Sequence, residues 1–276
     1  MNAAELTALR YEVDQGVAVV TIDRPDRRNA WGGREAVEYR WALHHAHTDP
    51  DVRVVVLTGA GADFCVGADT RALDTIDDSG GGYRRESTPL PPYPDGTPEA
   101  LHRNHCAPLL VSTPIIAAIE GACAGVGFVL ATYADLRWVA QNAKITSAFA
   151  ALGLPAEYGS AWMLTRQVGV SNALRLLYDA DVRDGDEVAR LGWAQEVCAP
   201  GTTLARALDY ARHLARHSSP ASLASMKRAV LLDAAGDMAS AYDRSVADMD
   251  AALRNGEMRR GLAARKAKTR PDYLDD

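Results

Sequence analysis

Two short apolar runs, each followed at once by a loop rich in glycine and alanine, constrain the fold of this chain most strongly. The first run is 52–58 (VRVVVLT) with the loop 59–69 (GAGADFCVGAD), and the second is 115–119 (IIAAI) with the loop 120–127 (EGACAGVG). Near-continuous apolar strands are typical of a sheet covered on both faces. Glycine permits backbone conformations that other residues resist. The pattern predicts an α/β fold in which buried strands lead into tight loops.

The rest of the chain divides into an α/β part and a helical part. Beyond Asn172, Ala, Leu, Arg and Asp recur at spacings of three and four, which indicates several amphipathic helices. We therefore expect a core over 1–200 and a helical C-terminal region over 201–276. The other predicted features are strands over 16–23 and 136–140, a helix over 34–47, and helix breaks at Pro220, Gly236 and Gly256.

One segment of the N-terminal part, at about 74–98, has a different composition. It is dense in glycine, proline, serine and acidic residues. Such a composition does not support a regular core element. We expect a mobile surface insertion there.

Composition excludes several classes of function. The formal charge of -6 gives no basic field to hold a nucleic acid, so nucleic acid is not an expected partner. No apolar run approaches the ~20 residues that span a bilayer, and the first residues lack the pattern of a signal peptide, so we expect no membrane partner and a cytoplasmic location. The four cysteines are widely spaced with no CxxC pair, which favours reduced thiols over a zinc site or a disulfide framework.

Three segments carry a resemblance to a known family. They are 21–31 (TIDRPDRRNAW), 52–69 and 119–138 (IEGACAGVGFVLATYADLRW), and in order and spacing they resemble the signatures of the enoyl-CoA hydratase/isomerase (crotonase) family. The resemblance implies a crotonase-like ββα spiral core with a helical C-terminal trimerisation region, assembled as a homotrimer or a dimer of trimers. It also implies an acyl-CoA substrate, with coenzyme A arriving as part of the thioester and no metal or redox cofactor.

The resemblance assigns the two glycine-rich loops to an oxyanion hole. Negative charge develops on a thioester oxygen when the neighbouring carbon loses a proton, and preorganised N–H donors can stabilise it. Carried over, the donors are the N–H groups of Ala68 and Val126, with Gly67 and Gly125 allowing the thioester to approach. Either loop alone also fits a simple strand-to-helix turn, but both at the family's spacing favour the hole.

The resemblance also places the coenzyme's nucleotide near the first segment. Cationic side chains there could pair with its phosphates, although each arginine alone also fits a solvated turn. Asp69 can instead orient its own loop. The residues expected to contact the coenzyme or the thioester are Arg24, Arg28, Ala30, Gly67, Ala68, Asp69, Gly125 and Val126.

The two glutamates of a family hydratase are missing. Their positions are occupied by Val129 and Phe149, which cannot accept a proton. A carboxylate nearby, Glu157, resembles the single catalytic glutamate of the family's Δ3,Δ2-enoyl-CoA isomerases. One carboxylate suffices for that reaction, because it can take a proton from C2 and return it to C4. The alternative role for Glu157 is that of an acid stabilising a helix N-terminus.

These observations make double-bond isomerisation, with Glu157 as acid and base, the leading hypothesis. One alternative is a hydratase or hydrolase whose water is activated from the 74–105 region, and another is a non-catalytic acyl-CoA binder. His102 and His105 lie three residues apart beside the 74–98 segment, so one of them could reach a substrate, although both also fit an ordinary polar helix face. The acidic residues that could activate water in that region are Asp74, Asp77, Asp78 and Glu86. A separate group of histidines, His44, His45 and His47, has no carboxylate at metal-ligand spacing, so we expect no metal site there.

Overall fold

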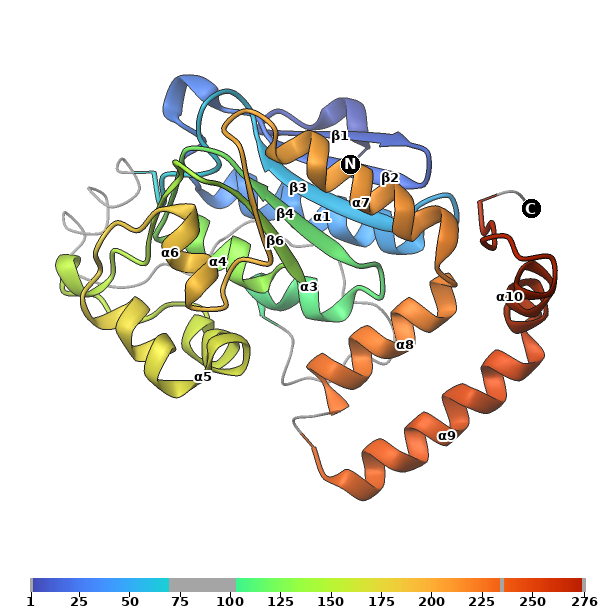
Figure 1. The fold of residues 1–276 in the computed structure, drawn as a ribbon. Helices are drawn as coiled ribbons and strands as arrows, with labels where there is room; N and C mark the ends of the chain where they lie inside the picture. Colours follow the sequence, from blue (N-terminus) through green and yellow to red (C-terminus); the bar gives the residue numbers. More distant parts are fainter. Residues whose placement is uncertain (1, 70–102, 234–235, 275–276) are drawn as a thin grey trace.

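A six-stranded sheet forms the centre of the molecule, with strand order β1-β2-β3-β4-β6-β8 (Figure 1). The computed structural model describes residues 2–69, 103–233 and 236–274. Strands β1 and β2 are antiparallel, and the remaining neighbours are parallel. The strands are β1 (Leu9–Asp14), β2 (Val17–Ile22), β3 (Val54–Gly59), β4 (Ile115–Ile119), β6 (Leu136–Ala140) and β8 (Glu196–Cys198). A second, parallel sheet pairs β5 (Ala122–Ala124) with β7 (Lys144–Thr146).

Helices cover both faces of the central sheet, as its sequence requires. Along β3, Val55 and Leu57 belong to the apolar cluster that includes α1 (Gly33–Thr48), whereas Val54 and Val56 pack with α7 (Thr203–His217). Side chains of a strand alternate between faces, so an uninterrupted apolar run is buried on both sides. Helix α7 presents alanines at every fourth position, Ala207, Ala211 and Ala215, and all three are fully buried against the sheet.

A second group of helices surrounds the end of the sheet that carries the glycine-rich loops. Helix α4 (Val126–Tyr133) is buried along its whole length and packs against α5 (Ser160–Tyr178). Its burial on every side explains why its sequence is apolar throughout. The shorter helices are η1 (Ala3–Glu5), η2 (Pro25–Arg27), η4 (Asn104–Cys106), α3 (Ala107–Leu110), η5 (Ala150–Leu152) and α6 (Gly185–Arg190).

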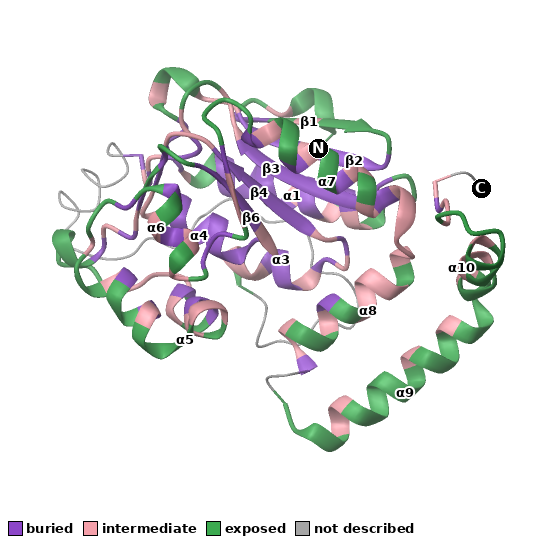
Figure 2. Cartoon of the chain, in the orientation of Figure 1, coloured by how far each residue is buried: buried purple, intermediate pink, exposed green. Residues whose placement is uncertain are grey.

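The C-terminal helices α8 (Pro220–Leu231), α9 (Met238–Arg254) and α10 (Glu257–Lys266) extend away from the sheet (Figure 1). None of the residues of α9 is buried, and Figure 2 shows this helix as largely exposed. The chain then returns to α7, where the Tyr273 N–H donates to the Arg216 carbonyl at 2.8 Å. The exposed apolar side chains of α9 are Met238, Tyr242, Val246, Met249 and Leu253.

The structure confirms most of the predicted elements. The strands expected over 16–23, 52–58, 115–119 and 136–140 and the helix expected over 34–47 are present, with ends shifted by one or two residues. The expected breaks are also present, since α8 begins at Pro220, Gly236 lies between α8 and α9, and Gly256 lies between α9 and α10. Strands β1, β5, β7 and β8 were not predicted. The expected insertion at 74–98 lies outside the described residues, and the division at residue 200 stays a prediction.

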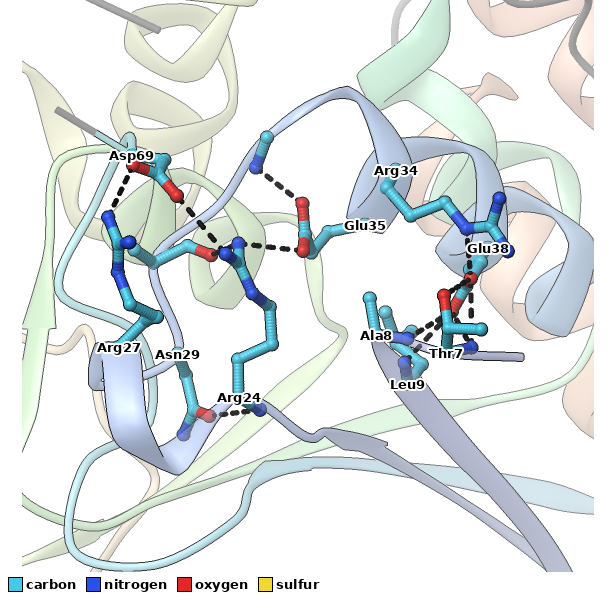
Figure 3. Close-up of polar contacts among 12 residues, drawn as sticks. Thr7, Ala8, Leu9, Arg24, Arg27, Asn29, Arg34, Glu35, Glu38 and Asp69 are labelled. Carbon is cyan, nitrogen blue, oxygen red and sulfur yellow. Dashed lines mark hydrogen bonds and ion pairs between the residues drawn. The ribbon is translucent and has the colours of Figure 1, made fainter. Parts of the chain in front are cut away.

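A buried carboxylate, that of Glu38, connects α1 to the N-terminal segment (Figure 3). It accepts hydrogen bonds from the N–H groups of Thr7, Ala8 and Leu9 at 2.9 to 3.2 Å and from Arg34 Nε at 2.6 Å. Burial by itself raises the pKa of Glu38, but the N–H groups of Ala8 and Thr7 and the Arg34 side chain outweigh it, so the net pKa is lowered. The carboxylate is therefore held ionised in the folded state.

We expect Glu38→Gln to lower the free energy of unfolding by about 1–3 kcal/mol at neutral pH, because an amide cannot accept all of these hydrogen bonds. A lowered folded-state pKa contributes stability that is complete above the ordinary carboxyl value of 4.5 and is lost as the pH falls through the folded-state pKa. Urea unfolding at pH 7 and at pH 3.5 measures both effects. The difference between variant and parent should be smaller at pH 3.5, and an equal difference would contradict this role.

Candidate active site

The first glycine-rich loop returns from β3 and pairs with the segment after η2. The Trp31 N–H donates to the Gly67 carbonyl, and the Asp69 N–H donates to the Trp31 carbonyl, both at 2.8 Å. Consecutive residues of extended chain direct their N–H groups to opposite sides. The Ala68 N–H therefore points away from Trp31, and in the described part of the chain no residue accepts a hydrogen bond from it.

The second loop ends where α4 begins. Gly125 has φ 51° and ψ -117°, a conformation that side-chain-bearing residues rarely adopt. Val126 is the first residue of α4, so its N–H is one of the donors that a helix leaves without an intrahelical acceptor. No described residue accepts from this N–H either. The positive end of the helix dipole is aimed in the same direction.

The two loops touch through their backbones. A Cβ atom on Gly67 would lie 3.2 Å from the Ala124 carbonyl oxygen, and one on Gly125 would lie 3.7 Å from the Gly67 Cα. Behind them, the Ala124 N–H donates to the Cys65 carbonyl at 3.0 Å. The contact brings the loops that carry the Ala68 and Val126 donors together, which is the arrangement that an oxyanion hole requires.

A buried arginine fixes the other end of α4. The guanidinium of Arg137 donates from Nη1 to the carbonyls of Ala131 at 3.2 Å and Ala134 at 2.8 Å, and from Nε to the carbonyl of Trp193. It lies 5.5 Å from the centre of the Trp193 ring. Burial lowers the pKa of Arg137 to about 10, so it stays charged at neutral pH. The carbonyl groups at the end of the helix thus gain hydrogen-bond donors, and the buried cation gains acceptors.

The positions of the two hydratase glutamates lie in one apolar cluster. Val129 and Phe149 are buried and pack together with Tyr133, Leu109 and Met163. Neither side chain can accept a proton from water, so this pair cannot supply the base for hydration.

Glu157 lies beside this cluster, since its neighbours Ala156 and Tyr158 both pack against it. Its side chain is half-buried, and burial raises its pKa above the ordinary value of 4.5. The N-cap of α5 is Gly159, with no side-chain hydrogen bond to the helix, so Glu157 does not cap this helix. In the part of the chain that the structure describes, no group forms an ion pair or hydrogen bond with the carboxylate. Glu157 therefore has no capping role in α5, and its catalytic role stays a prediction.

The arginines expected near the nucleotide differ in what they contact (Figure 3). Arg24 forms ion pairs with Glu35 at 2.8 Å and Asp69 at 3.2 Å, and Arg27 binds Asp69 at 2.8 Å. Asp69 therefore holds the first loop to η2, as its alternative reading anticipated. Arg28 pairs with Asp63 but keeps 63% of its side chain exposed, and Ala30 accepts from Arg24 Nη1 at 3.0 Å.

An open groove of about 460 Å³ lies beside these ion pairs. Charged groups of both signs and the backbone at the start of α1 face it. The residues lining it are Thr7, Ala8, Arg24, Gly32, Gly33, Arg34, Glu35 and Asp69. Of these, only Arg24 and Asp69 were expected from the sequence.

Asn29 has a role that the sequence reading missed. Its Nδ2 donates to the carbonyls of Ala60 at 2.9 Å and Asp63 at 2.6 Å, and its Oδ1 accepts from the Arg24 N–H at 3.0 Å. Its φ of 58° is one that asparagine tolerates better than most residues. A fully buried asparagine thus joins the first segment to the first loop. The signal was an asparagine between charged and apolar residues in a turn, which indicates side-chain hydrogen bonding to backbone.

Among the other candidates from the sequence, His47 lies apart from this site, His105 lies beside the residue that follows Glu157, and the remainder lie outside the described residues. His47 Nδ1 contacts Ser112 at the far end of α1, and His105 stacks on Tyr158. In 2–69, 103–233 and 236–274 no three His, Cys, Asp or Glu side chains are grouped so that they could hold a metal ion. The same ranges contain no helix with the length and apolarity needed to traverse a bilayer. His102 and the acidic residues at 74, 77, 78 and 86 lie outside the described residues.

Comparisons with known proteins show to which family this chain is similar. A family model described as enoyl-CoA hydratase/isomerase matches residues 12–275. A probable enoyl-CoA hydratase of Rhodobacter capsulatus is 35% identical over 80% of each chain. The 1,2-epoxyphenylacetyl-CoA isomerase of Escherichia coli is 29% identical, covering 95% of this chain and 96% of that protein.

Solved structures show the same fold. A probable enoyl-CoA hydratase/isomerase from Mycobacterium abscessus superimposes with a TM-score of 0.82 at 28% identity, over 95% of this chain and 97% of the other. A putative enoyl-CoA hydratase from Streptomyces coelicolor gives 0.84 at 26% identity, over 99% and 96%. The fold is therefore the expected crotonase-like α/β fold, and the chain belongs to the enoyl-CoA hydratase/isomerase family of acyl-CoA enzymes.

Proposed function

We propose that this enzyme moves a carbon–carbon double bond along the acyl chain of an enoyl-CoA. The thioester oxygen accepts hydrogen bonds from the N–H groups of Ala68 and Val126. The Glu157 carboxylate removes a proton from C2 of a 3-enoyl-CoA, and the electron pair of that C–H bond delocalises into a dienolate whose oxygen the two donors hold. The same carboxyl group then returns the proton to C4, which gives the 2-enoyl-CoA with no change in mass.

The observation that carries this proposal is the environment of the Glu157 carboxylate. Its carboxylate is half-buried, has a raised pKa and is not used for helix capping. A pKa moved toward neutrality suits a group that must both accept and return a proton. The neighbouring cluster with Val129 and Phe149 is apolar, which supports exclusion of the water that hydration would need.

We further propose that the coenzyme's nucleotide lies along the first segment, near Arg28 and Ala30. All three arginines pair with acidic side chains, but Arg28 keeps 63% of its side chain exposed against 25% for Arg24 and Arg27, so its guanidinium is better placed to meet a phosphate. In this arrangement Arg24 and Asp69 hold the loop rather than the ligand, while Gly67 and Gly125 give the thioester access to the backbone.

Hydration is the second candidate, and the names of the relatives favour it. The Rhodobacter capsulatus relative is named a probable hydratase, whereas the Escherichia coli relative is named an isomerase. A hydratase reaction here would need a base other than the residues at 129 and 149, because Val129 and Phe149 supply none.

Product analysis separates these reactions. The purified enzyme is mixed separately with a series of 3-enoyl-CoA and 2-enoyl-CoA thioesters, and products are identified by mass and retention time. We expect conversion of 3-enoyl to 2-enoyl thioester without change of mass. A gain of 18 mass units, roughly one water, would establish hydration instead, and binding without turnover would identify a non-catalytic acyl-CoA binder.

The proposed mechanism also sets a pH dependence. Glu157 must be ionised to take the proton from C2, so kcat should fall as the pH falls through its folded-state pKa. Because burial raises that pKa, the acidic limb should lie above the ordinary carboxyl value of 4.5. A pH profile of kcat measures it, and an acidic limb at or below 4.5 would argue against Glu157 as the base.

We also propose a homotrimer or a dimer of trimers. Helix α9 carries exposed apolar side chains along its length and buries none of its residues within the protomer, so a neighbouring copy is the natural cover for it. Sedimentation equilibrium of the purified protein measures the mass directly, and a monomer at micromolar concentration would reject the proposal.

A further inference from the structure

The backbone that carries Glu157 adopts an unusual turn. The Ser160 N–H donates to the Glu157 carbonyl at 2.9 Å, and the two residues between them have positive φ, 52° at Tyr158 and 73° at Gly159. Positive φ at both central residues defines a type I′ turn, whose first central position strongly prefers Asn, Asp or Gly. A tyrosine there costs roughly 1–2 kcal/mol relative to an ordinary conformation. Something outside the turn must hold Tyr158 in place.

Side chains from other elements contact Tyr158, among them those of His105 and Tyr133. The His105 ring stacks on the Tyr158 ring, with centroids 3.7 Å apart and planes inclined by 24°. The Tyr133 hydroxyl, at the end of α4, donates to the Tyr158 carbonyl at 2.6 Å. The first contact restrains the side chain of the residue after Glu157, and the second restrains its backbone.

The surroundings of His105 keep its ring neutral. Burial lowers the pKa of His105 to about 4, so the imidazole carries no charge at neutral pH. A neutral ring adds no positive charge near the Glu157 carboxylate and so does not oppose the raised pKa of that group. Its Nε2 is buried and lacks a hydrogen-bond partner, which indicates that the ring acts through its face.

We propose that His105 is a positioning residue for Glu157, acting by holding Tyr158 in the left-handed conformation that the turn requires. This inference rests on the proposed role of Glu157 as acid and base. His105 lies on η4, immediately before α3, whose Leu109 packs in the same apolar cluster as Val129 and Phe149. The imidazole thus holds the turn at a fixed position relative to that cluster. In this proposal it does not contact the reacting atoms.

Two substitutions of His105 test whether its face or its nitrogen matters. We expect His105→Ala to lower kcat about 10- to 100-fold with KM changed less than about twofold, because a small displacement of a catalytic group has an effect of that size. His105→Phe keeps the stacking face and should retain kcat within about threefold of the parent. His213→Ala, at an exposed histidine on α7, is the control. Equal losses for Ala and Phe would show that the nitrogen acts directly and would overturn the proposal.

A double-mutant cycle that combines His105→Ala with Tyr158→Asn tests whether His105 acts on Glu157 through Tyr158. Asparagine adopts positive φ without help, so in this background His105→Ala should change kcat less than about threefold. An unchanged 10- to 100-fold loss would reject the route through Tyr158. Glu157→Gln distinguishes failure of the proposed function from failure of the positioning role of His105. If it leaves turnover intact, the proposed function fails, and if it abolishes turnover while His105 and Tyr158 show no coupling, only the positioning role fails.

Discussion

Replacing Glu157 with glutamine is expected to lower kcat for 3-enoyl-CoA isomerisation by 10² to 10⁴-fold, roughly the contribution of a general acid/base. The amide keeps the size of the side chain and lacks the basic oxygen, so binding should persist. Stopped-flow or coupled assays give kcat, and calorimetric titration with a 2-enoyl-CoA gives Kd. The acidic limb of the pH profile should disappear together with the activity.

The control for Glu157→Gln is Glu12→Gln, on the exposed edge strand β1. It makes the same chemical change far from the glycine-rich loops and should leave kcat unaltered. Full activity in the Glu157→Gln enzyme would remove this residue from the mechanism. A residual rate above that of the uncatalysed reaction is still expected, because the Ala68 and Val126 donors remain.

Gly127→Ala is the second substitution with a large expected effect. A Cβ atom at Gly127 would lie 2.4 Å from the Cys65 carbonyl oxygen, a backbone atom that cannot turn aside. The two loops must then separate, which should reduce kcat by about 10² to 10³-fold, the loss typical of one oxyanion donor. It should also lower the free energy of unfolding by about 1–3 kcal/mol through overpacking. Kinetics and urea unfolding measure the two effects.

The direction of the change in unfolding free energy for Gly127→Ala is informative. Alanine within a helix is ordinarily more favourable than glycine by about 1 kcal/mol, so a loss of stability would have to come from the close contact. Gly236→Ala is the matched control, since a Cβ atom there would come no nearer than 3.4 Å to another atom and its φ is not positive. Gly236→Ala should be close to neutral in both measurements. A stabilised and fully active Gly127→Ala enzyme would mean that the loops do not need this close contact.

The central sheet could be predicted from the sequence because its strands are buried on both faces. Runs such as 115–119 are apolar at every position, and no other local structure explains them so simply. Strand β1 could not be predicted in the same way. Its residues Arg10, Glu12 and Asp14 are charged, and it lies at an edge of the sheet, where one side of the strand faces solvent.

The two oxyanion donors and Glu157 were expected from family resemblance, and their environment only became visible in three dimensions. The sequence does not show that Arg24 and Arg27 form ion pairs with Asp69, because each arginine is more than 40 positions from that aspartate. It likewise gives no sign that His105 stacks on Tyr158. Long-range side-chain contacts depend on packing, which the local pattern of a chain does not encode.

The buried Arg137 has an electrostatic consequence for the reaction. An isolated helix offers a partial positive charge at its start and a partial negative charge at its end, and the two act on a distant anion in opposite senses. In α4 the terminal carbonyls are bound to a full positive charge. Over roughly 12 Å, the length of an eight-residue helix, that cation attracts a unit negative charge by about 1.4 kcal/mol at an effective dielectric constant of ~20. The helix thus presents a net positive field to the proposed dienolate, rather than the weaker field of a dipole.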